Sequence, residues 1–249
     1  MQRTVETWFW QLHYAGMTGD TDRVMSLIAR AVDINSRAYD GETALHWACG
    51  SGHIAAASLL ISRGADVHSR DGSGQTALHR ARRQPPIVAM LLESGADVHS
   101  RDNDGWTALH EACISGATAT VSLLIERGVR VNIRDSSGET ALHVACSERE
   151  RNTAILLIES KADIYIKNND GKTPLDLRPE WRKELTELYN TVNRAWLARK
   201  SFLFVLIGCG HVGGVAGGGE PVEESEQSAY ERLRDEVLRN VYTNIMSYL

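Results

Sequence analysis

Hydrophobic and polar positions recur along this chain in units of about 33 residues. In the clearest unit, Leu45, Ala48 and Cys49 occupy positions i, i+3 and i+4, as on one face of a short helix. The apolar segment 54–62 predicts a second helix, and Gly64 is placed to end it in the left-handed conformation. Each unit is therefore predicted to be a pair of short helices followed by a turn.

A short motif sets the period. Thr-Ala-Leu-His begins at Thr43, Thr76, Thr107 and Thr140, and a diverged copy, Thr-Pro-Leu-Asp, begins at Thr173. The intervals between these threonines are 33, 31, 33 and 33 residues. Each threonine is placed to cap a helix, because its hydroxyl can accept a hydrogen bond from a first-turn N–H group. A fixed interval of this size indicates stacked units, because one pair of short helices cannot cover its own apolar face.

The complete pattern resembles the ankyrin-repeat family. Asp40-Gly41 precedes Thr-Ala-Leu-His, Gly52-His53 separates the two helices, and Gly64-Ala65-Asp66-Val67 follows the second helix, as in the family motif. The resemblance extends over about residues 4–198. It implies an all-α fold, an ankyrin-repeat solenoid in which each repeat is a helix-turn-helix plus a projecting β-hairpin loop.

Beyond the regular repeats, the pattern predicts three parts. Residues 4–37 form a degenerate first repeat, and a longer helix over 181–200 caps the last one, so the repeat domain spans residues 1–198. Residues 199–227 contain an apolar run and then a glycine-rich and acidic linker. Residues 228–249 are predicted to form an amphipathic helix. The solenoid thus has a C-terminal helical extension.

Two repeats depart from the pattern. The unit at 71–101 is two residues short, and Arg82 replaces the small buried residue of the other copies. The pair Pro85-Pro86 forces a break before its second helix. A local kink or an exposed notch is expected there. In a later repeat, Arg149 and Lys161 stand where the family pattern has glycine.

Composition narrows the function. The chain has 249 residues and a net charge of −5, which offers no basic excess for binding nucleic acid. Its N-terminus has no apolar signal-peptide core, so a cytoplasmic or nuclear location is expected. Cys49, Cys113 and Cys146 occupy equivalent repeat positions. Adjacent stacked helices lie about 8–10 Å apart, beyond the ~7 Å limit for bridging Cα atoms, so these cysteines are predicted to be reduced core residues.

Two patterns suggest chemistry but are better explained by structure. His46, His110 and His143 each precede a cysteine by three residues, but stacking separates these pairs too widely for one metal ion. Each histidine is instead expected to bond the backbone of the neighbouring turn. No Ser/His/Asp or Cys/His set comes together in the sequence. The chain is therefore predicted not to be an enzyme and to need no metal or cofactor.

The segment 208–213 reads G-x-G-x-x-G after the apolar run 202–207, which is interpreted as strand-like. Dinucleotide binding would require a following helix and a second parallel strand, for which too little chain remains. A nucleotide-binding enzyme is thus a remote alternative, and a flexible linker is favoured. A membrane span over 202–219 is disfavoured because the segment is short and contains seven glycines.

A basic column allows two interpretations. It consists of Arg37, Arg70, Arg101, Arg134 and Lys167, each just before a turn. The column could face an acidic partner, but a solvated face with local charge pairing is favoured, because exposed pairs contribute only about 0–1 kcal/mol.

The turn tips and the outer ends of the first helices have no expected role in the core, so they are predicted to bind a partner. Trp106 is the leading candidate because tryptophan is common among interface hot spots and an exposed one at a turn tip contributes little to the fold. The alternative is partial burial of Trp106 against an adjacent turn. Trp47 is predicted to be core. Specificity is expected in the variable residue before each repeated threonine, in particular Glu42, Gln75, Trp106 and Glu139. The predicted partner-binding residues are Tyr39, Asp40, Glu42, Ser73, Gln75, Arg83, Gln84, Asn103, Asp104, Trp106, Ile114, Ser115, Ser136, Ser137, Glu139 and Glu148.

The sequence thus favours a non-catalytic scaffold or adaptor, expected to be a monomer, that binds a protein on its concave surface of turns and first helices. It predicts no small-molecule substrate. In the alternative adaptor, the helix at 228–249 docks a larger complex such as a ubiquitin ligase.

Overall fold

The computed structural model describes the backbone of residues 2–209 and the side chains of residues 8 and 10–196. Five helix pairs follow one another and are succeeded by two 3-10 turns and a long helix. The α-helices are α1 (Gln2–Thr18), α2 (Thr21–Ala29), α3 (Ala44–Ser51), α4 (Ile54–Ser62), α5 (Ala77–Arg80), α6 (Pro85–Glu93), α7 (Ala108–Ile114), α8 (Thr118–Glu126), α9 (Ala141–Ser147), α10 (Arg151–Glu159) and α11 (Arg182–Cys209), and the 3-10 helices are η1 (Pro174–Asp176) and η2 (Pro179–Trp181).

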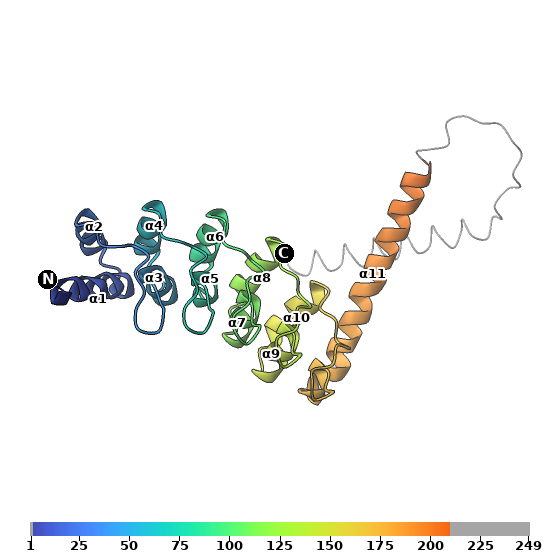
Figure 1. Cartoon of the computed structure of the whole chain (residues 1–249). Helices are drawn as coiled ribbons and strands as arrows, with labels where there is room; N and C mark the ends of the chain where they lie inside the picture. Colours follow the sequence, from blue (N-terminus) through green and yellow to red (C-terminus); the bar gives the residue numbers. More distant parts are fainter. Residues whose placement is uncertain (1, 210–249) are drawn as a thin grey trace, which may run out of the picture. The chain divides into compact units, whose positions relative to one another are not determined.

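The chain divides into two compact units, residues 1–189 and residues 190–249. In the first unit, the first helices of the pairs form one row and the second helices form another, as Figure 1 shows for α3, α5, α7 and α9 against α4, α6, α8 and α10. The predicted all-α solenoid is therefore confirmed, and α1 with α2 forms the expected first repeat.

One leucine from each helix builds a continuous core between the rows. Leu45, the second residue of α3, is 1% exposed, and Leu60 of α4 is fully buried. None of the helices α3 to α10 exceeds nine residues, and isolated helices shorter than about 12–15 residues are marginal in water. Stacking therefore supplies the stability of each pair. The equivalent leucines, all at most 1% exposed, are Leu78, Leu91, Leu109, Leu124, Leu142 and Leu157.

The loops between repeats are tight turns. Among the described residues, the only β-type pairing is an isolated bridge between Arg134 and Thr140, so the expected hairpin loops contain no extended strands. An aspartate stabilises three of these turns, at Asp71, Asp102 and Asp135, and Asn168 takes this role in the next one. Oδ1 of Asp102, for example, accepts hydrogen bonds from the backbone N–H groups of Asp104 at 3.0 Å and Trp106 at 2.8 Å. These turns hold the residues just before each first helix in a fixed geometry.

The long C-terminal helix begins where the sequence predicted it. Leu185 of α11 is fully buried, and Leu188 and Tyr189 pack against the core of the repeats, so the first turns of α11 cap the array. The helix then runs without interruption across residue 198, the predicted end of the repeat domain. Among the described residues, no helix combines the length and the apolar content that crossing a membrane requires.

Of the region after residue 198, the structure describes the backbone up to residue 209. The apolar run 202–207 is helical, so the interpretation of this run as strand-like was wrong, and the strand that a dinucleotide fold would need is absent there. The rest of the G-x-G-x-x-G segment, the acidic linker and the predicted helix at 228–249 lie outside the described residues.

Candidate partner-binding surface

Each repeated histidine joins its own helix to the next repeat. The backbone N–H of Thr43 donates to Nδ1 of His46 at 3.1 Å. Because Nδ1 is the acceptor, the ring proton is on Nε2, which donates to the carbonyl oxygen of Gln75 at 3.1 Å. His46 thus caps the first turn of α3 and bonds the turn that precedes α5.

The same arrangement recurs in the other repeats. His79 bonds the carbonyl of Trp106 and His143 that of Lys172, both at 3.1 Å. His110 accepts the corresponding backbone N–H at 3.2 Å, and its ring packs against the Trp106 side chain at 5.9 Å between centroids. The predicted bond from histidine to the neighbouring turn is confirmed for His46 and His143 and also forms at His79, whereas Nε2 of His110 is buried without a hydrogen-bond partner, so the prediction was wrong there. These histidines therefore serve as inter-repeat links.

Burial fixes the charge state of these groups. It lowers the pKa of all four motif histidines, that of His110 to about 4, so their rings are neutral near pH 7. Burial also raises the pKa of the Cys49 and Cys146 thiols to about 12, which leaves them protonated and unreactive. Both cysteines are fully buried, as the sequence predicted. Within the described residues, no three potential metal ligands come together.

The residues before the repeated threonines are less accessible than expected. The sequence treated Glu42 as available for recognition, but it is only 4% exposed and forms an ion pair with Arg80 of the next repeat. Gln75 is half-buried, and its Nε2 donates to Oε1 of Glu111 at 2.7 Å. Both side chains reach across a repeat boundary. The prediction that these two side chains are available for recognition was wrong. Sequence position alone does not show which residue of the next repeat reaches across the boundary.

Trp106 and Glu139 are held in the same way. Trp106 is half-buried and packs against the core, and its Nε1 donates to Oδ2 of Asp135 at 3.0 Å. Nδ2 of Asn168 donates to Oε1 of Glu139 at 3.1 Å. The expectation that Trp106 contributes little to the fold is therefore corrected. The variable column beside Thr-Ala-Leu-His stabilises the boundaries between repeats.

The basic column also has a structural role. A terminal guanidinium nitrogen of Arg101 donates to the carbonyl of Arg134 at 2.6 Å, and Arg134 donates to that of Lys167 at 3.1 Å. Arg37 bonds the carbonyl of Arg70 in the same way. The arginines therefore tie successive turns together through backbone carbonyls, instead of the local charge pairing that the sequence favoured.

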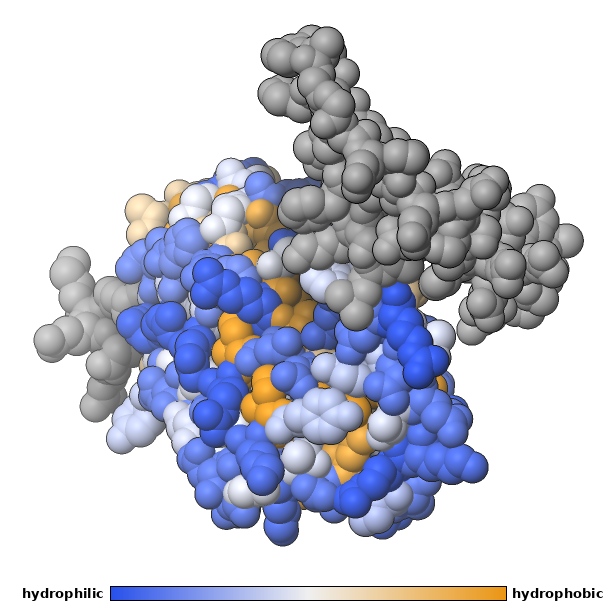
Figure 2. Space-filling model, turned by 90° about the vertical axis from the view of Figure 1, so that its right-hand side faces the viewer, coloured by the Kyte–Doolittle hydropathy of each residue, from blue (hydrophilic) through white to orange (hydrophobic). Residues whose placement is uncertain are grey.

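Most of the other predicted partner-binding residues remain accessible. Tyr39 stands out, since its side chain is fully exposed at 101% of the reference area. The part of the surface seen in Figure 2 is mostly hydrophilic, with small apolar patches between polar side chains. Gln84 and Ser115 are half-buried. The exposed residues of the predicted set are Tyr39, Asp40, Ser73, Arg83, Asn103, Asp104, Ile114, Ser136, Ser137 and Glu148.

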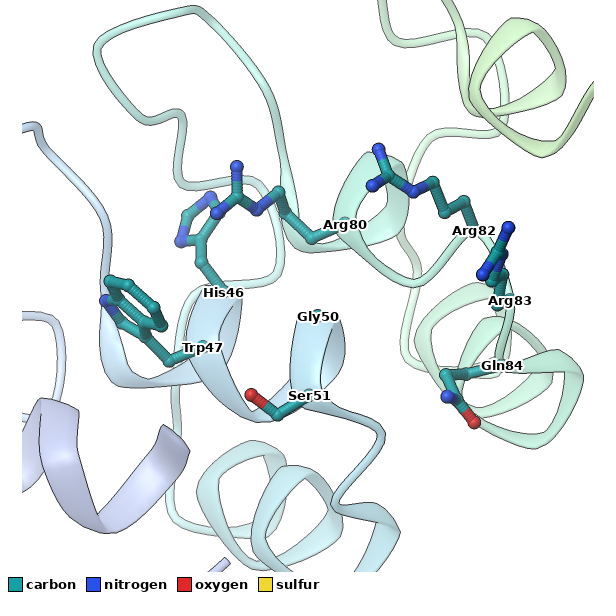
Figure 3. Close-up of a pocket in the computed structure, with 8 residues that line it drawn as sticks. All are labelled: His46, Trp47, Gly50, Ser51, Arg80, Arg82, Arg83 and Gln84. Atoms are coloured by element: carbon teal, nitrogen blue, oxygen red, sulfur yellow. The ribbon is translucent and has the colours of Figure 1, made fainter. Parts of the chain in front are cut away.

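The shortened repeat contains a pocket at the place where the sequence predicted a kink or notch. Helix α5 has only four residues, whereas α3 has eight, and the missing outer turns leave a pocket of about 440 Å³ between the two helices. Figure 3 shows Arg80 extending toward His46 of α3, and Arg82 and Arg83 on the other side of this space. Trp47 lines the pocket and is half-buried, so its predicted place in the core was wrong. The lining residues are His46, Trp47, Gly50, Ser51, Arg80, Arg82, Arg83 and Gln84.

Stacked helix pairs joined by repeated turns define a helical repeat protein. A family model described as ankyrin repeats matches residues 12–102 and 82–168. These matches span more than half of the chain. The chain therefore belongs to the ankyrin-repeat family. A comparison with curated proteins gave no match.

Proposed function

We propose that this protein is a non-catalytic scaffold that binds a protein partner through its turn tips and the outer ends of its first helices. Ankyrin repeats generally mediate protein–protein interactions, and the family is typically non-catalytic. Recognition then depends on the side chains that the repeats leave exposed, because the stack itself fixes only the shape.

The exposure of Tyr39 is the observation that carries this proposal. The ring lies at the tip of the turn before α3 and is 101% exposed, so it contributes no burial to the fold. A tyrosine has a large apolar area, a polar hydroxyl and few rotatable bonds, which suits it to bury against a partner at low entropic cost. Tyr39 therefore replaces Trp106 as the principal contact to test.

Ile114 provides a second contact on the same row of first helices. It is the last residue of α7 and is 39% exposed. Ile54, at the start of α4, is 45% exposed but belongs to the row of second helices. These two isoleucines have similar exposure and different locations, so they form a matched pair for locating the binding surface.

The test is affinity capture with the full chain, followed by mass spectrometry. We expect Tyr39→Ala to lose a protein that the wild type captures, and Ile114→Ala to weaken its capture. Ile54→Ala should capture that protein as the wild type does. Thermal melting should be nearly unchanged for all three variants, since exposed substitutions typically alter stability by less than about 0.5 kcal/mol. Equal capture by the wild type, Tyr39→Ala and Ile114→Ala would contradict the proposed surface.

A further inference from the structure

We propose that the pocket between α3 and α5 binds acidic side chains on an extended segment of the partner protein. This inference rests on the proposed scaffold function and specifies the chemistry of its partner. Three arginines within four residues, Arg80, Arg82 and Arg83, line one side of the pocket. A guanidinium presents its N–H groups in a planar fork that matches the two oxygens of a carboxylate.

Buried carboxylates hold two of these arginines in place. Arg80 is paired with Glu42, and its Nη1 also lies 4.0 Å from Oδ2 of the buried Asp71. Nη1 of Arg82 lies 2.9 Å from Oε2 of Glu111. The glutamate side chains are 5% and 8% exposed, whereas the two arginine side chains are 34% and 51% exposed. Each guanidinium has five N–H donors, so donors remain after these pairs have formed. The arginines are thus oriented before a partner arrives, and they face outward.

Arg83 supplies the charge that is not neutralised within the repeat. Its described hydrogen bond is made by Nη2 to the carbonyl oxygen of Ser115 at 3.3 Å, and no ion pair to a described carboxylate accompanies it. Its side chain is exposed. Arg83 can therefore turn toward an incoming carboxylate at little cost to the fold. Among the arginines of the pocket, Arg83 is the one that no described carboxylate pairs with.

The opposite wall gives the pocket its shape. Gly50 is exposed near the end of α3, and the lack of a side chain keeps the space in front of the arginines open, as Figure 3 shows. Trp47 adds an aromatic surface, and Ser51 and Gln84 add polar groups. Such a mixed wall can contact both the carboxylate and the aliphatic part of a glutamate or aspartate side chain.

The size of the basic cluster favours an acidic peptide over a nucleic acid. Proteins that bind nucleic acid typically contact about 6–10 phosphates along an extended basic surface. Here three arginines line one pocket of about 440 Å³. A short run of carboxylates on a protein fits this confined cluster and the bidentate geometry of arginine.

Fluorescence anisotropy with the full chain tests the inference directly. The probes are a fluorescein-labelled peptide of six glutamates and a matched peptide of six glutamines. We expect the glutamate peptide to bind at least about tenfold more tightly, and its affinity to fall as salt rises. Equal binding of the two peptides, or no saturable binding, would overturn the proposal.

Two pocket variants and one control locate the binding. A Cβ atom at Gly50 would lie 3.7 Å from Cβ of Arg80, an ordinary contact, so Gly50→Leu should fill the pocket without disturbing α3. We expect Gly50→Leu and Arg83→Gln each to weaken binding about tenfold. Arg130→Gln, a change at an exposed arginine outside the pocket, should bind as the wild type does. Wild-type affinity in both pocket variants would contradict the assigned site.

Competition with inorganic phosphate distinguishes a carboxylate site from a phosphoryl site. Displacement of the labelled peptide by phosphate at lower concentration than by unlabelled glutamate peptide would identify a phosphoryl site and overturn the carboxylate assignment. The scaffold proposal fails separately. If Tyr39→Ala loses a partner while the glutamate peptide never binds, only the chemistry assigned to the pocket is wrong.

Discussion

The first helices α3 and α5 begin alike and end differently. His46 and His79 make the same pair of bonds, to the threonine N–H of their own motif and to the carbonyl of the following turn, all at 3.1 Å. Yet α3 has eight residues and α5 only four. The inter-repeat link therefore depends on the first turn of the helix. The outer turns can be lost, and the residues that replace them are free to serve recognition.

Acid should destabilise all four repeated motifs through their buried histidines, which is the largest effect we expect. The pKa of each motif histidine is lowered in the folded state, so between that pKa and about 6.5 the unfolded chain binds more protons. The histidine contribution is complete above about pH 6.5 and is lost as the pH falls toward the folded pKa, about 4 for His110. Each unit of pKa difference corresponds to about 1.4 kcal/mol.

Urea unfolding at pH 7 and pH 5 measures this loss. We expect a lower midpoint at pH 5. Glu42 acts in the opposite direction, because burial raises its pKa, but it is one group against four histidines. An unchanged midpoint would mean that the histidines are not held neutral by the fold.

Removal of either histidine tests whether the link is equal in the long and the short helix. His46→Ala and His79→Ala should each reduce the free energy of unfolding by about 3 kcal/mol, because each leaves a buried threonine N–H without its acceptor. The two losses should agree within about 0.5 kcal/mol. His68→Ala, at an exposed histidine, is the control. A clearly smaller loss for His79→Ala would show that the short helix is linked differently.

Truncation of Trp106 extends the comparison to the turn before α7. Trp106→Ala should cost about 2 kcal/mol, since it removes half-buried packing and the Nε1 bond to Asp135. Trp106→Phe should retain part of the packing and cost about half as much. Thermal melting compares both variants with the wild type. A melt unchanged by Trp106→Ala would restore the original expectation that this residue is free for binding.

The smallest effect on stability is expected at Lys161, whose backbone is in the left-handed conformation. Gly95 ends the second helix of the short repeat at φ +91°, and Lys161 takes φ +70° after α10. Residues with a Cβ atom lose about 1–2 kcal/mol in this conformation, so Lys161→Gly should stabilise the array by about 1 kcal/mol. Gly95→Lys should destabilise it by a similar amount. In urea unfolding, we expect Lys161→Gly to raise the midpoint and Gly95→Lys to lower it.

The repeated features were predictable from the sequence because they are local. Thr43 and His46 lie three residues apart on one helix turn, so their bonds follow from the motif and its period. The two-residue deletion near Arg82 likewise indicated where the pocket lies. The family motif over residues 4–198 therefore gave the all-α repeat architecture correctly.

The contacts across repeat boundaries were harder to predict. Glu42 is buried because Arg80, in the next repeat, extends across it, and Trp106 is held by Asp135 in the same manner. These pairs are 38 and 29 residues apart in the chain, and each involves a position that differs between repeats. Because these positions differ between repeats, the sequence suggested that they serve recognition. In the structure, their side chains instead hold neighbouring repeats together.

The comparison of α3 with α5 is tested most directly by restoring the missing residues. In this chimera, the five residues 48–52 of the full-length unit replace residues 81–83 of the short one. We expect the chimera to remain folded because the histidine link is untouched, with a somewhat lower melting temperature because the buried Glu111 loses its ion pair with Arg82. The affinity for the labelled glutamate peptide should fall about tenfold or more. A folded chimera that still binds the peptide at wild-type affinity, or a chimera that unfolds, would contradict the central claim that the short helix is a recognition feature independent of the link between repeats.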